Sequence, residues 1–425
     1  CSPGMVMNMY SLLESKSGQV TMQEVENAFG GNLCRCTGYR PILDAFKSLA
    51  IDAEPCLKVA CQDIEELPKI CQNTGKPCQG RCGPLAKKGL HLVFENQREW
   101  HKVYNVQDVF AILEKIGSRP YMLVAGNTAH GVYRRSHSLE VFIDISSIEE
   151  LKYHSLGSSS LTVGASSTLT QLLQILTEAA VKSTDFRYCT ELAKHVDLIA
   201  NVPVRNAGTI AGNLWMKNRY REFPSDLFLI LAAVGAKLTI AEAGGKLNNV
   251  LVEDFPNLDL NKKIILNVVF PPLNANKFEF RSFKVMPRAQ SVHAYVNAAF
   301  LFEFNTDKSL VTSASLCFGG INSTFIHASS TENFVRGKNI FSDEVLQSVF
   351  KNLSSEITPE DKPGDASVEY RKLLTTTLLY RAVLDIASKH QIPITSKYQS
   401  AAQGLHRPLT TSKQEFQTIQ KKTGP

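Results

Sequence analysis

We predict an α+β protein with a small all-helical domain, then a larger two-lobed α+β domain with a further α+β subdomain. Three patterns support this prediction. Residues 1–52 show only helical periodicity, and from about residue 89 short apolar strands alternate with amphipathic helices. After Pro271-Pro272, strand-like runs precede a long amphipathic helix. A chain of 425 residues with 44% hydrophobic side chains can form two or three such cores.

The first 52 residues are predicted to form helices. Met5 and Met9 follow helical spacing, and Thr21 to Glu24 has the pattern of a capping box at the start of a second helix. Gly30-Gly31 should end that helix, and Pro41 should start another. The segment between them, with its cysteines, is therefore expected to be a turn at one end of a compact helical domain.

Cys34 and Cys36 lie one residue apart in this turn. A Cys-x-Cys step directs two sulfurs at one point, as a metal or iron–sulfur centre requires. Cys1 adds a third thiolate, whereas a [2Fe–2S] cluster needs four. From the residues alone, two free thiols in an exposed turn and a zinc site remain alternatives, although no second spaced pair completes a zinc tetrahedron.

Residues 53–88 are predicted to be a linker, because their apolar residues show little periodicity. The segment is rich in Lys, Gln, Gly and Pro and contains five more cysteines: Cys56, Cys61, Cys71, Cys78 and Cys82. Another metal site is the alternative, but the spacing of these cysteines fits no zinc pattern. We therefore interpret them as incidental thiols.

Residues 89–275 are predicted to form the larger domain, with two glycine-bearing turns. A buried strand over 121–125 leads into the first turn at Gly126. The second turn spans 206–213, and the pattern before it leaves a strand or another element open. Further strands are expected at 141–145 and 161–164, and helices at 169–179 and 225–234. Backbone amides in such turns can bind an anion, although an ordinary strand–turn element is the alternative. Neither turn has the Gly-x-Gly-x-x-Gly fingerprint, so a Rossmann site is not supported.

Residues 276–392 are predicted to be the further α+β subdomain, with strands at 298–304 and 314–319 and a helix over 370–386. The polar segment 393–425 is predicted to be a connector to a following domain. Cys317 lies in an apolar stretch and Cys189 in a mixed one. Both are predicted to be small side chains packed in a core.

Several of these motifs resemble one known family. Cys1 to Met5 and Gly31 to Ile42 look like the second, helical [2Fe–2S] domain of the xanthine dehydrogenase and aldehyde oxidase family. Leu123 to Gly131 and Arg205 to Asn213 look like its two FAD-binding segments. The resemblance implies a FAD domain of the vanillyl-alcohol-oxidase and CO-dehydrogenase flavoprotein type, with a flavoprotein C-terminal-like subdomain after it. We expect the chain to be a fragment, because residue 1 falls within a motif.

The resemblance also implies which residues bind the cofactors. Cys1, Cys34 and Cys36 would be iron ligands, with a fourth cysteine missing upstream. The first FAD-binding segment would hold the pyrophosphate region through its backbone, and the later residues would contact the ribityl chain and the isoalloxazine. The implied FAD-binding residues are Leu123, Val124, Ala125, Gly126, Asn127, Thr128, Ala129, His130, Ile199, Ala200, Thr209, Gly212, Asn213, Asp226, Leu266 and Lys284.

Two of these residues have plain structural alternatives. Asp226 stands at a predicted helix start, where an aspartate commonly caps the helix or interacts with its dipole. Lys284 could be a surface lysine whose stem lies along apolar neighbours. No residue is a candidate catalytic acid, base or nucleophile, because the flavin supplies the redox chemistry.

Three departures from the family's dehydrogenases favour an aldehyde oxidase that uses O2. The loop 255–262 lacks the tyrosine that holds NAD, residues 286–293 replace an acidic stretch, and Ile199 replaces an aromatic residue. The expected function is therefore the electron-transfer portion of a molybdo-flavoprotein that oxidises aldehydes to carboxylic acids. A xanthine dehydrogenase-like segment that reduces NAD and a zinc-stabilised binding module are the alternatives.

The expected partners follow from the same resemblance. The molybdenum domain, with its cofactor, and the N-terminal [2Fe–2S] domain would belong to the full-length chain, which would form a homodimer. A modest net charge of +6, without a basic block, argues against nucleic acid, and no apolar run is long enough to span a membrane. Thiolates reserved for iron favour the reducing cytoplasm.

Overall fold

The protein was analysed as a computed structural model that describes residues 2–34, 37–61, 89–131, 133–134, 136–288, 291–361, 364 and 366–393. The chain divides into two compact units, Cys1–Ala86 and Lys87–Pro425. The iron ligands predicted at Cys1 and Cys36, the linker thiols Cys71, Cys78 and Cys82, and nearly all of the C-terminal connector lie outside the described residues. The domain limits drawn from the sequence remain predictions.

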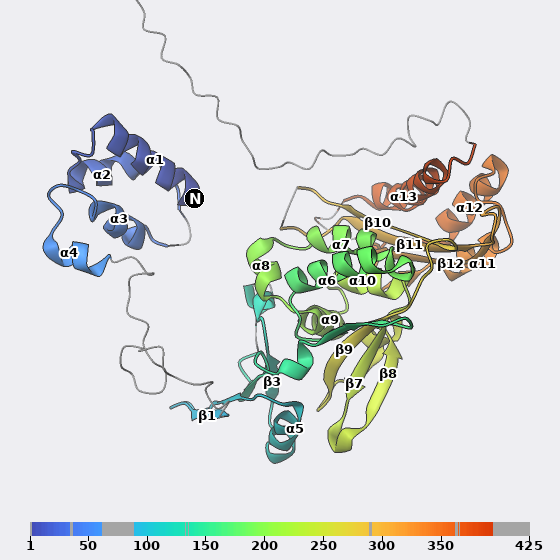
Figure 1. Ribbon diagram of the computed structural model, residues 1–425, viewed down its shortest axis with the longest axis horizontal. Coiled ribbons are helices and arrows are strands. Elements are labelled where there is room, and N and C mark those ends of the chain that lie inside the picture. The colour runs from blue at the N-terminus through green and yellow to red at the C-terminus, as the bar shows by residue number, and fades with distance from the viewer. Residues whose placement is uncertain are drawn as a thin grey trace, which may run out of the picture. The chain divides into compact units, whose positions relative to one another are not determined.

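The first unit is helical, as predicted (Figure 1). Its elements are α1 (Ser2–Ser15), α2 (Met22–Ala28), a 3-10 turn (Phe29–Gly31), α3 (Arg40–Lys47) and α4 (Pro55–Ala60). The capping box is present: Thr21 accepts from the Glu24 amide, and Glu24 accepts from the Thr21 amide. Met5, Met9, Val25 and Phe29 form a small buried core. Helix α4 was not predicted, since it lies in the segment interpreted as a linker.

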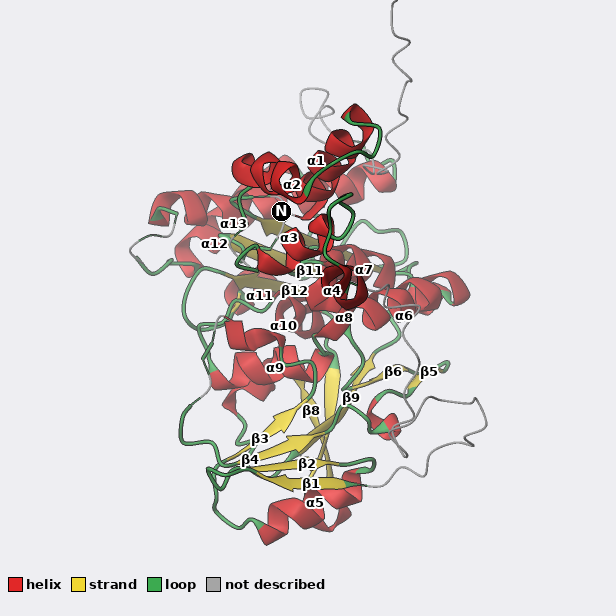
Figure 2. Cartoon of the chain, turned by 90° about the vertical axis from the view of Figure 1, so that its left-hand side faces the viewer, coloured by secondary structure: helices red, strands yellow, loops and turns green. Residues whose placement is uncertain are grey.

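The second unit begins with a four-stranded sheet in the order β1-β2-β4-β3. Its strands are β1 (Leu90–Val93), β2 (Glu99–Lys102), β3 (Tyr121–Val124) and β4 (Val141–Asp144). Strands β1 and β2 form an antiparallel hairpin, whereas β4 runs parallel to both β2 and β3. Helix α5 (Val106–Lys115) packs against this sheet (Figure 2). Only Val124 of β3 is fully buried, so this strand is less buried than predicted.

A second, antiparallel sheet has the order β5-β6-β9-β7-β8. Its strands are β5 (His154–Leu156), β6 (Leu161–Gly164), β7 (Lys237–Ala241), β8 (Leu247–Leu251) and β9 (Ile264–Phe270). Four helices share a core with it: α6 (Leu169–Lys182), α7 (Cys189–Asp197), α9 (Ile210–Arg219) and α10 (Asp226–Ala233). Helix α8 (Val202–Ala207) contacts α6. Short 3-10 turns lie at Thr128–Gly131, Glu149–Leu151, Thr184–Phe186, Ala243–Gly245 and Val252–Asn257.

The third sheet is an antiparallel meander, β10-β11-β12-β13. Its elements are β10 (Phe278–Val285), β11 (Val296–Phe304), β12 (Val311–Gly319), β13 (Ile326–His327), α11 (Ser329–Val335), α12 (Asp343–Glu356) and α13 (Val368–Lys389). One core joins α11, α12 and α13 to this sheet, and another joins α7 and α10 to the second and third sheets. Helices therefore cover the third sheet from both sides (Figure 1).

The sequence left open whether the second glycine turn follows a strand. It does not end a strand, because residues 202–207 and 210–219 form helices α8 and α9 with Gly208 and Thr209 between them. Asn201 caps α8 through the Val204 amide, and Pro203 lies in its first turn, where its missing N–H costs nothing. Gly212 and Asn213 consequently lie in the first turn of α9.

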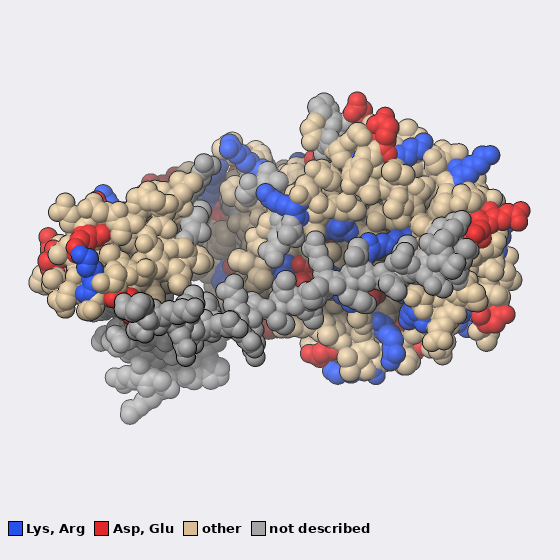
Figure 3. All heavy atoms as spheres, turned by 90° about the horizontal axis from the view of Figure 1, so that it is seen from above, with Lys and Arg blue, Asp and Glu red and all other residues tan. Residues whose placement is uncertain are grey.

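The sequence predicted that Cys189 and Cys317 pack in a core, and both are buried. Burial raises the pKa of Cys189 to about 12 and that of Cys317 further still. Charges of both signs are interspersed on the face shown in Figure 3. Among the described residues, no helix combines the length and the apolarity that crossing a membrane requires.

Candidate FAD-binding and iron–sulfur sites

The two glycine-bearing segments meet in space. A Cβ atom added to Gly126 would lie 1.8 Å from the carbonyl oxygen of Ala207, so only glycine allows this approach of the two backbones. Next to it, a Cβ on Gly208 would lie 3.1 Å from Oγ1 of Thr128. Segments some eighty residues apart in sequence, both predicted to bind FAD, therefore form one structure.

The first of these turns presents its residues to solvent. Asn127, Thr128 and His130 are exposed, while Val124 at the end of β3 is buried. Asn127 has a φ of 55°, a left-handed conformation that asparagine tolerates better than most residues. The core of the first sheet thus fixes a turn whose outer surface remains available to a ligand.

The N-terminus of α9 lies at the same place. Thr209 caps the helix: its Oγ1 accepts from the Gly212 amide at 3.1 Å. Gly212 itself is exposed, and Asn213 is half-buried. The amides of Ile210, Ala211 and Asn213 donate to the carbonyl oxygens of Ser167, Ala165 and Thr209. What this helix N-terminus offers a phosphate group is therefore the partial positive charge of the helix dipole. Together with the Gly126 turn, this arrangement fits a pyrophosphate.

Asn213 connects α9 to the next predicted ligand. Its Oδ1 accepts a hydrogen bond of 2.5 Å from Oγ of Ser225, and Ser225 in turn caps α10 through the Phe228 amide. Asp226 is the first residue of α10. The structure therefore links Thr209, Asn213 and Asp226 through two consecutive helix caps.

Asp226 forms a buried ion pair. Its Oδ2 lies 2.7 Å from Nζ of Lys284, and its Oδ1 accepts from Nδ2 of Asn297 at 2.7 Å. Only 1% of the Lys284 side chain is exposed, so the surface-lysine alternative is wrong. Burial by itself raises the pKa of Asp226, but His195 and the charge of Lys284 outweigh it and lower this pKa to about 2.

Two residues around this pair were missed from the sequence. Asn297 comes from β11, and Nε2 of His195 on α7 lies 3.6 Å from Oδ1 of Asp226. Neither ring nitrogen of His195 has a hydrogen-bond partner among the described residues, although the side chain is almost fully buried. No local motif marks either residue, because the positions come together only through packing of α7 and α10 against the third sheet.

The segment before α8 is fixed from several sides. The backbone carbonyl of Leu198 accepts from Nζ of Lys284 at 2.9 Å, and that of Ile199 accepts from Arg205 at 2.8 Å. Ala200 has a φ of 50°, an unusual conformation for alanine that tends to occur at functional sites. Its carbonyl accepts from the Ser291 amide at 3.1 Å. The segment with Ile199 and Ala200 is thus tied to Lys284 through the neighbouring carbonyl oxygen of Leu198.

The remaining predicted FAD residues lie in the core of the first sheet. Leu123, Ala125 and Leu266 are partly buried and pack against one hydrophobic cluster. The carbonyl oxygen of Leu266, on β9, accepts from the amide of Ala165 at 2.9 Å. Leu266 therefore joins the strand before the Gly126 turn to the second sheet.

An aromatic cluster lies close to the ion pair. Tyr133 packs against Tyr220 and Phe223, with ring centroids 4.4 and 5.9 Å away, and Phe223 contacts His293 at 5.7 Å. Burial lowers the pKa of His293, while the charge of Asp226 opposes this shift and that of Lys284 adds to it. The segment that replaces the acidic stretch of the dehydrogenases thus borders the predicted flavin site. Its described residues are 286–288 and 291–293.

Cys34 is the one predicted iron ligand among the described residues. It is buried, and its amide donates to the Tyr39 hydroxyl at 2.8 Å, while Oγ1 of Thr37 lies 3.2 Å from its sulfur. Asn8 on α1 donates to Oδ1 of Asn32 at 2.6 Å. Because α1 starts directly after Cys1, this bond holds the first helix beside the Cys34 turn. A donor next to the sulfur suits a thiolate that binds iron.

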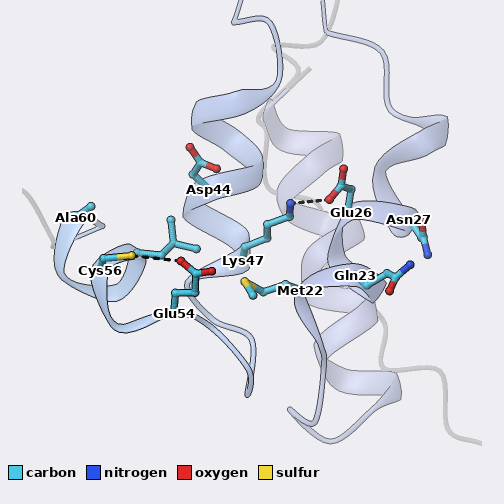
Figure 4. Close-up of a pocket in the computed structure, with 10 residues that line it drawn as sticks. Met22, Gln23, Glu26, Asn27, Asp44, Lys47, Glu54, Cys56 and Ala60 are labelled. Atoms are coloured by element: carbon cyan, nitrogen blue, oxygen red, sulfur yellow. Dashed lines mark hydrogen bonds and ion pairs between the residues drawn. The ribbon is translucent and has the colours of Figure 1, made fainter.

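The first unit also contains an open groove of about 880 Å³ between α2, α3 and α4 (Figure 4). Met22 lies in it, and Lys47 reaches across it to Glu26 at 2.6 Å. None of the residues predicted to bind FAD or iron lines the groove, so we assign no cofactor to it.

Comparison with known families matches three segments of the chain. Residues 1–47 match the [2Fe-2S] binding domain, 94–273 the FAD binding domain in molybdopterin dehydrogenase, and 281–386 the CO dehydrogenase flavoprotein C-terminal domain. The chain belongs to the xanthine dehydrogenase and aldehyde oxidase family. It accordingly carries the FAD-binding and [2Fe–2S]-binding parts of such an oxidoreductase.

Curated relatives agree with this assignment. An indole-3-acetaldehyde oxidase of Arabidopsis thaliana is 31% identical over 431 residues, covering 92% of this chain and 31% of the relative. Xanthine dehydrogenase 1 of the same plant is 26% identical over 484 residues, covering 100% of this chain and 35% of the relative. The chain thus spans about a third of the length of these members of the xanthine dehydrogenase and aldehyde oxidase family.

Solved structures of the family's wider fold group confirm the predicted fold. A chain of carbon monoxide dehydrogenase from Hydrogenophaga pseudoflava aligns with a TM-score of 0.57 at 20% identity, over 69% of this chain and 97% of that one. A chain of quinoline 2-oxidoreductase from Pseudomonas putida 86 aligns with a TM-score of 0.56, over 68% and 96%. This likeness establishes the α+β flavoprotein fold.

Proposed function

We propose that this chain is the electron-transfer portion of a molybdo-flavoprotein oxidase that oxidises aldehydes to carboxylic acids. In this proposal, electrons come from a molybdenum centre in another part of the full-length protein, pass through the [2Fe–2S] cluster to FAD, and reduce O2. One observation carries the proposal: the Gly126 turn meets the N-terminus of α9 beside the Asp226–Lys284 pair. When bound, FAD would supply the two-electron redox chemistry, and the chain would supply position and charge.

The proposed ligands have distinct tasks. Backbone groups from Leu123 to His130 would hold the pyrophosphate. Thr209, Asn213 and Asp226 would bind the phosphate–ribityl part, and Leu266 would pack against the cofactor. Ile199 and Ala200 would shield the isoalloxazine, and Lys284 would place a positive charge near it. Because its ammonium is paired with Asp226, Lys284 would also act by fixing the segment that carries Ile199 and Ala200.

The choice of O2 over NAD rests on the surroundings of this site. Nδ2 of Asn218 donates to the carbonyl oxygens of Phe255 and Leu258 at 2.8 and 2.9 Å, so part of the loop 255–262 is held against α9. This loop has no tyrosine to stack on a nicotinamide nucleotide. Arg288 and His293 stand where the dehydrogenases have an acidic stretch. Both features favour the oxidase.

A xanthine dehydrogenase-like segment that reduces NAD is the second candidate, because a xanthine dehydrogenase aligns over the whole chain. The matches to FAD-binding and [2Fe–2S]-binding domains argue against the third candidate, a zinc-stabilised binding module. We further propose that the full-length protein is a cytoplasmic homodimer that includes the molybdenum and N-terminal [2Fe–2S] domains.

Reoxidation of the reduced protein tests the proposal. The purified chain, reduced anaerobically with dithionite, is mixed with O2 or with NAD+, and the flavin absorbance is followed. We expect rapid reoxidation by O2 and no NADH. Formation of NADH would instead support the dehydrogenase. The chain alone should not oxidise aldehydes, and aldehyde turnover by it would contradict the proposed division of tasks.

A further inference from the structure

We propose that the hairpin β1–β2 carries a binding site for a divalent transition metal ion, formed by His91, Glu99 and His101. The three side chains offer two imidazole nitrogens and one carboxylate oxygen, and these atoms lie within 4.8 Å of one another. None of these three residues is among those predicted to bind flavin or iron.

The hairpin register brings the three ligands together. His91 on β1 pairs directly with His101 on β2, and Glu99 precedes His101 by two residues, so it lies on the same face of the strand. The two imidazole rings stack with centroids 4.1 Å apart and planes 9° apart. Cross-strand neighbours on one face are the closest side-chain pairs in a sheet, so the backbone itself sets this geometry.

Both histidines direct their Nε2 atoms at one oxygen of the Glu99 carboxylate. Oε2 of Glu99 lies 2.8 Å from Nε2 of His91 and 3.1 Å from Nε2 of His101. Ligands around a tetrahedral zinc ion, with bonds of about 2.1 Å, are roughly 3.4 Å apart. Small side-chain rotations would therefore let one ion replace the two contacts with Glu99, with both rings in the tautomer protonated on Nδ1.

Neighbouring groups orient the carboxylate. Arg119 donates from Nη1 to Oε1 of Glu99 at 2.5 Å and from Nε to Oε2 of Glu140 at 2.9 Å. The guanidinium therefore holds one oxygen of Glu99 and leaves the other facing the histidines, an orienting role that outer groups often have around metals. Two carboxylates against one guanidinium leave a net negative charge, which favours a cation.

The type of ligand selects the type of ion. Two imidazoles and one carboxylate suit Zn²⁺, Cu²⁺ or Ni²⁺, whereas Mg²⁺ and Ca²⁺ prefer oxygen ligands throughout. His91 is exposed, so a fourth position remains open to water or another donor. Because β1 is exposed along its whole length, a bound ion would also tie this edge strand to β2 (Figure 2).

Zinc binding to the full chain tests the proposal by equilibrium dialysis and titration calorimetry. The variants are His91→Ala and Glu99→Gln, with His154→Ala as a control for an exposed histidine elsewhere. Cysteine thiols also bind zinc, but they are the same in every variant. The difference from the unmodified chain therefore isolates this site.

At a zinc concentration that fills the site in the unmodified chain, we expect the unmodified chain and His154→Ala to bind one more Zn²⁺ than His91→Ala. This difference reflects an affinity of the site that is at least about tenfold lower in His91→Ala, and we expect the same loss of affinity in Glu99→Gln. Zn²⁺, but not Mg²⁺, should raise the unfolding midpoint of the unmodified chain more than that of His91→Ala. His91 is exposed, so its loss should leave the fold intact. Equal zinc stoichiometry and affinity in all variants would overturn the proposal.

Discussion

Nζ of Lys284 lies 2.7 Å from Oδ2 of Asp226, with 1% and 5% of the two side chains exposed. The pair joins β10 of the third sheet to the first turn of α10. Nζ of Lys284 also donates to the carbonyl oxygen of Leu198 at 2.9 Å. One lysine thus fixes both the helix that carries Asp226 and the segment proposed to shield the isoalloxazine.

Asp226→Asn should destabilise the protein by about 3–5 kcal/mol, because it leaves the Lys284 ammonium buried without its counter-charge. The free energy of unfolding in urea measures this loss. Lys182→Met is the matched control: its pair with Glu178 is 3.1 Å long but 63% and 61% exposed, so the loss should stay below about 1 kcal/mol. Equal effects of the two substitutions would contradict the role assigned to burial.

Gly126→Ala should separate the two FAD-binding segments. The added Cβ would meet the Ala207 carbonyl oxygen at 1.8 Å, and backbone on both sides must move, at a cost of at least about 1–3 kcal/mol. We expect the ratio of bound flavin to protein to fall strongly. Gly157→Ala serves as the control, since its Cβ would make an ordinary contact of 3.7 Å. Normal flavin content in Gly126→Ala would argue against this pyrophosphate site.

Cys34→Ser should remove iron without removing flavin. Cys34 is buried beside Thr37 and Tyr39, whereas Cys56 is exposed on α4, so Cys56→Ser is the control. Iron analysis and the visible spectrum report the cluster, and released flavin is counted separately. The assignment fails if Cys34→Ser retains as much iron as Cys56→Ser.

His327 should make stability depend on pH near neutrality. Nε2 of His327 lies 2.6 Å from Glu332 and Nδ1 lies 3.3 Å from Glu253, and the Glu332 contact raises the pKa of His327 above 6.5 despite burial. The stabilisation is therefore complete below pH 6.5 and is lost as the pH rises through the raised pKa.

Unfolding free energies from pH 6 to 9 in the unmodified chain and in His327→Gln test this dependence. Stability of the unmodified chain should decline over the range, and His327→Gln should flatten that decline. His154→Gln, at an exposed position on β5, should follow the unmodified chain. A parallel decline in His327→Gln would show that other groups cause the dependence.

Local signals in the sequence predicted much of the fold. The Thr21–Glu24 capping box, Pro41 and the apolar spacing of residues 169–179 gave helices close to those observed. Strand β10, which carries Lys284, was not predicted, because its residues are mostly half-buried and do not alternate cleanly. Helices α8 and α9 were missed, although Asn201 and Pro203 are start signals, because the glycines were interpreted as a turn.

The candidate site divides in the same way. Asp226 and Lys284 were found through the family resemblance, and the structure adds that they are partners. His195, Asn297 and the His91–Glu99–His101 cluster could not be predicted, since each depends on contacts between elements that no local motif records. Sequence patterns thus identify site residues that belong to a local turn or helix start. Residues that meet only when distant elements pack together are visible only in the structure.

The absorption spectrum of the purified chain, combined with flavin and iron analysis, shows whether FAD binds at the two contacting glycine segments and whether an iron–sulfur centre forms at Cys34. We expect a coloured protein with flavin bands and about one FAD per chain. In the full-length protein, which would supply the fourth cysteine, we also expect iron-dependent bands that Cys34→Ser removes. A colourless protein that contains no iron and retains no added FAD would contradict this expectation.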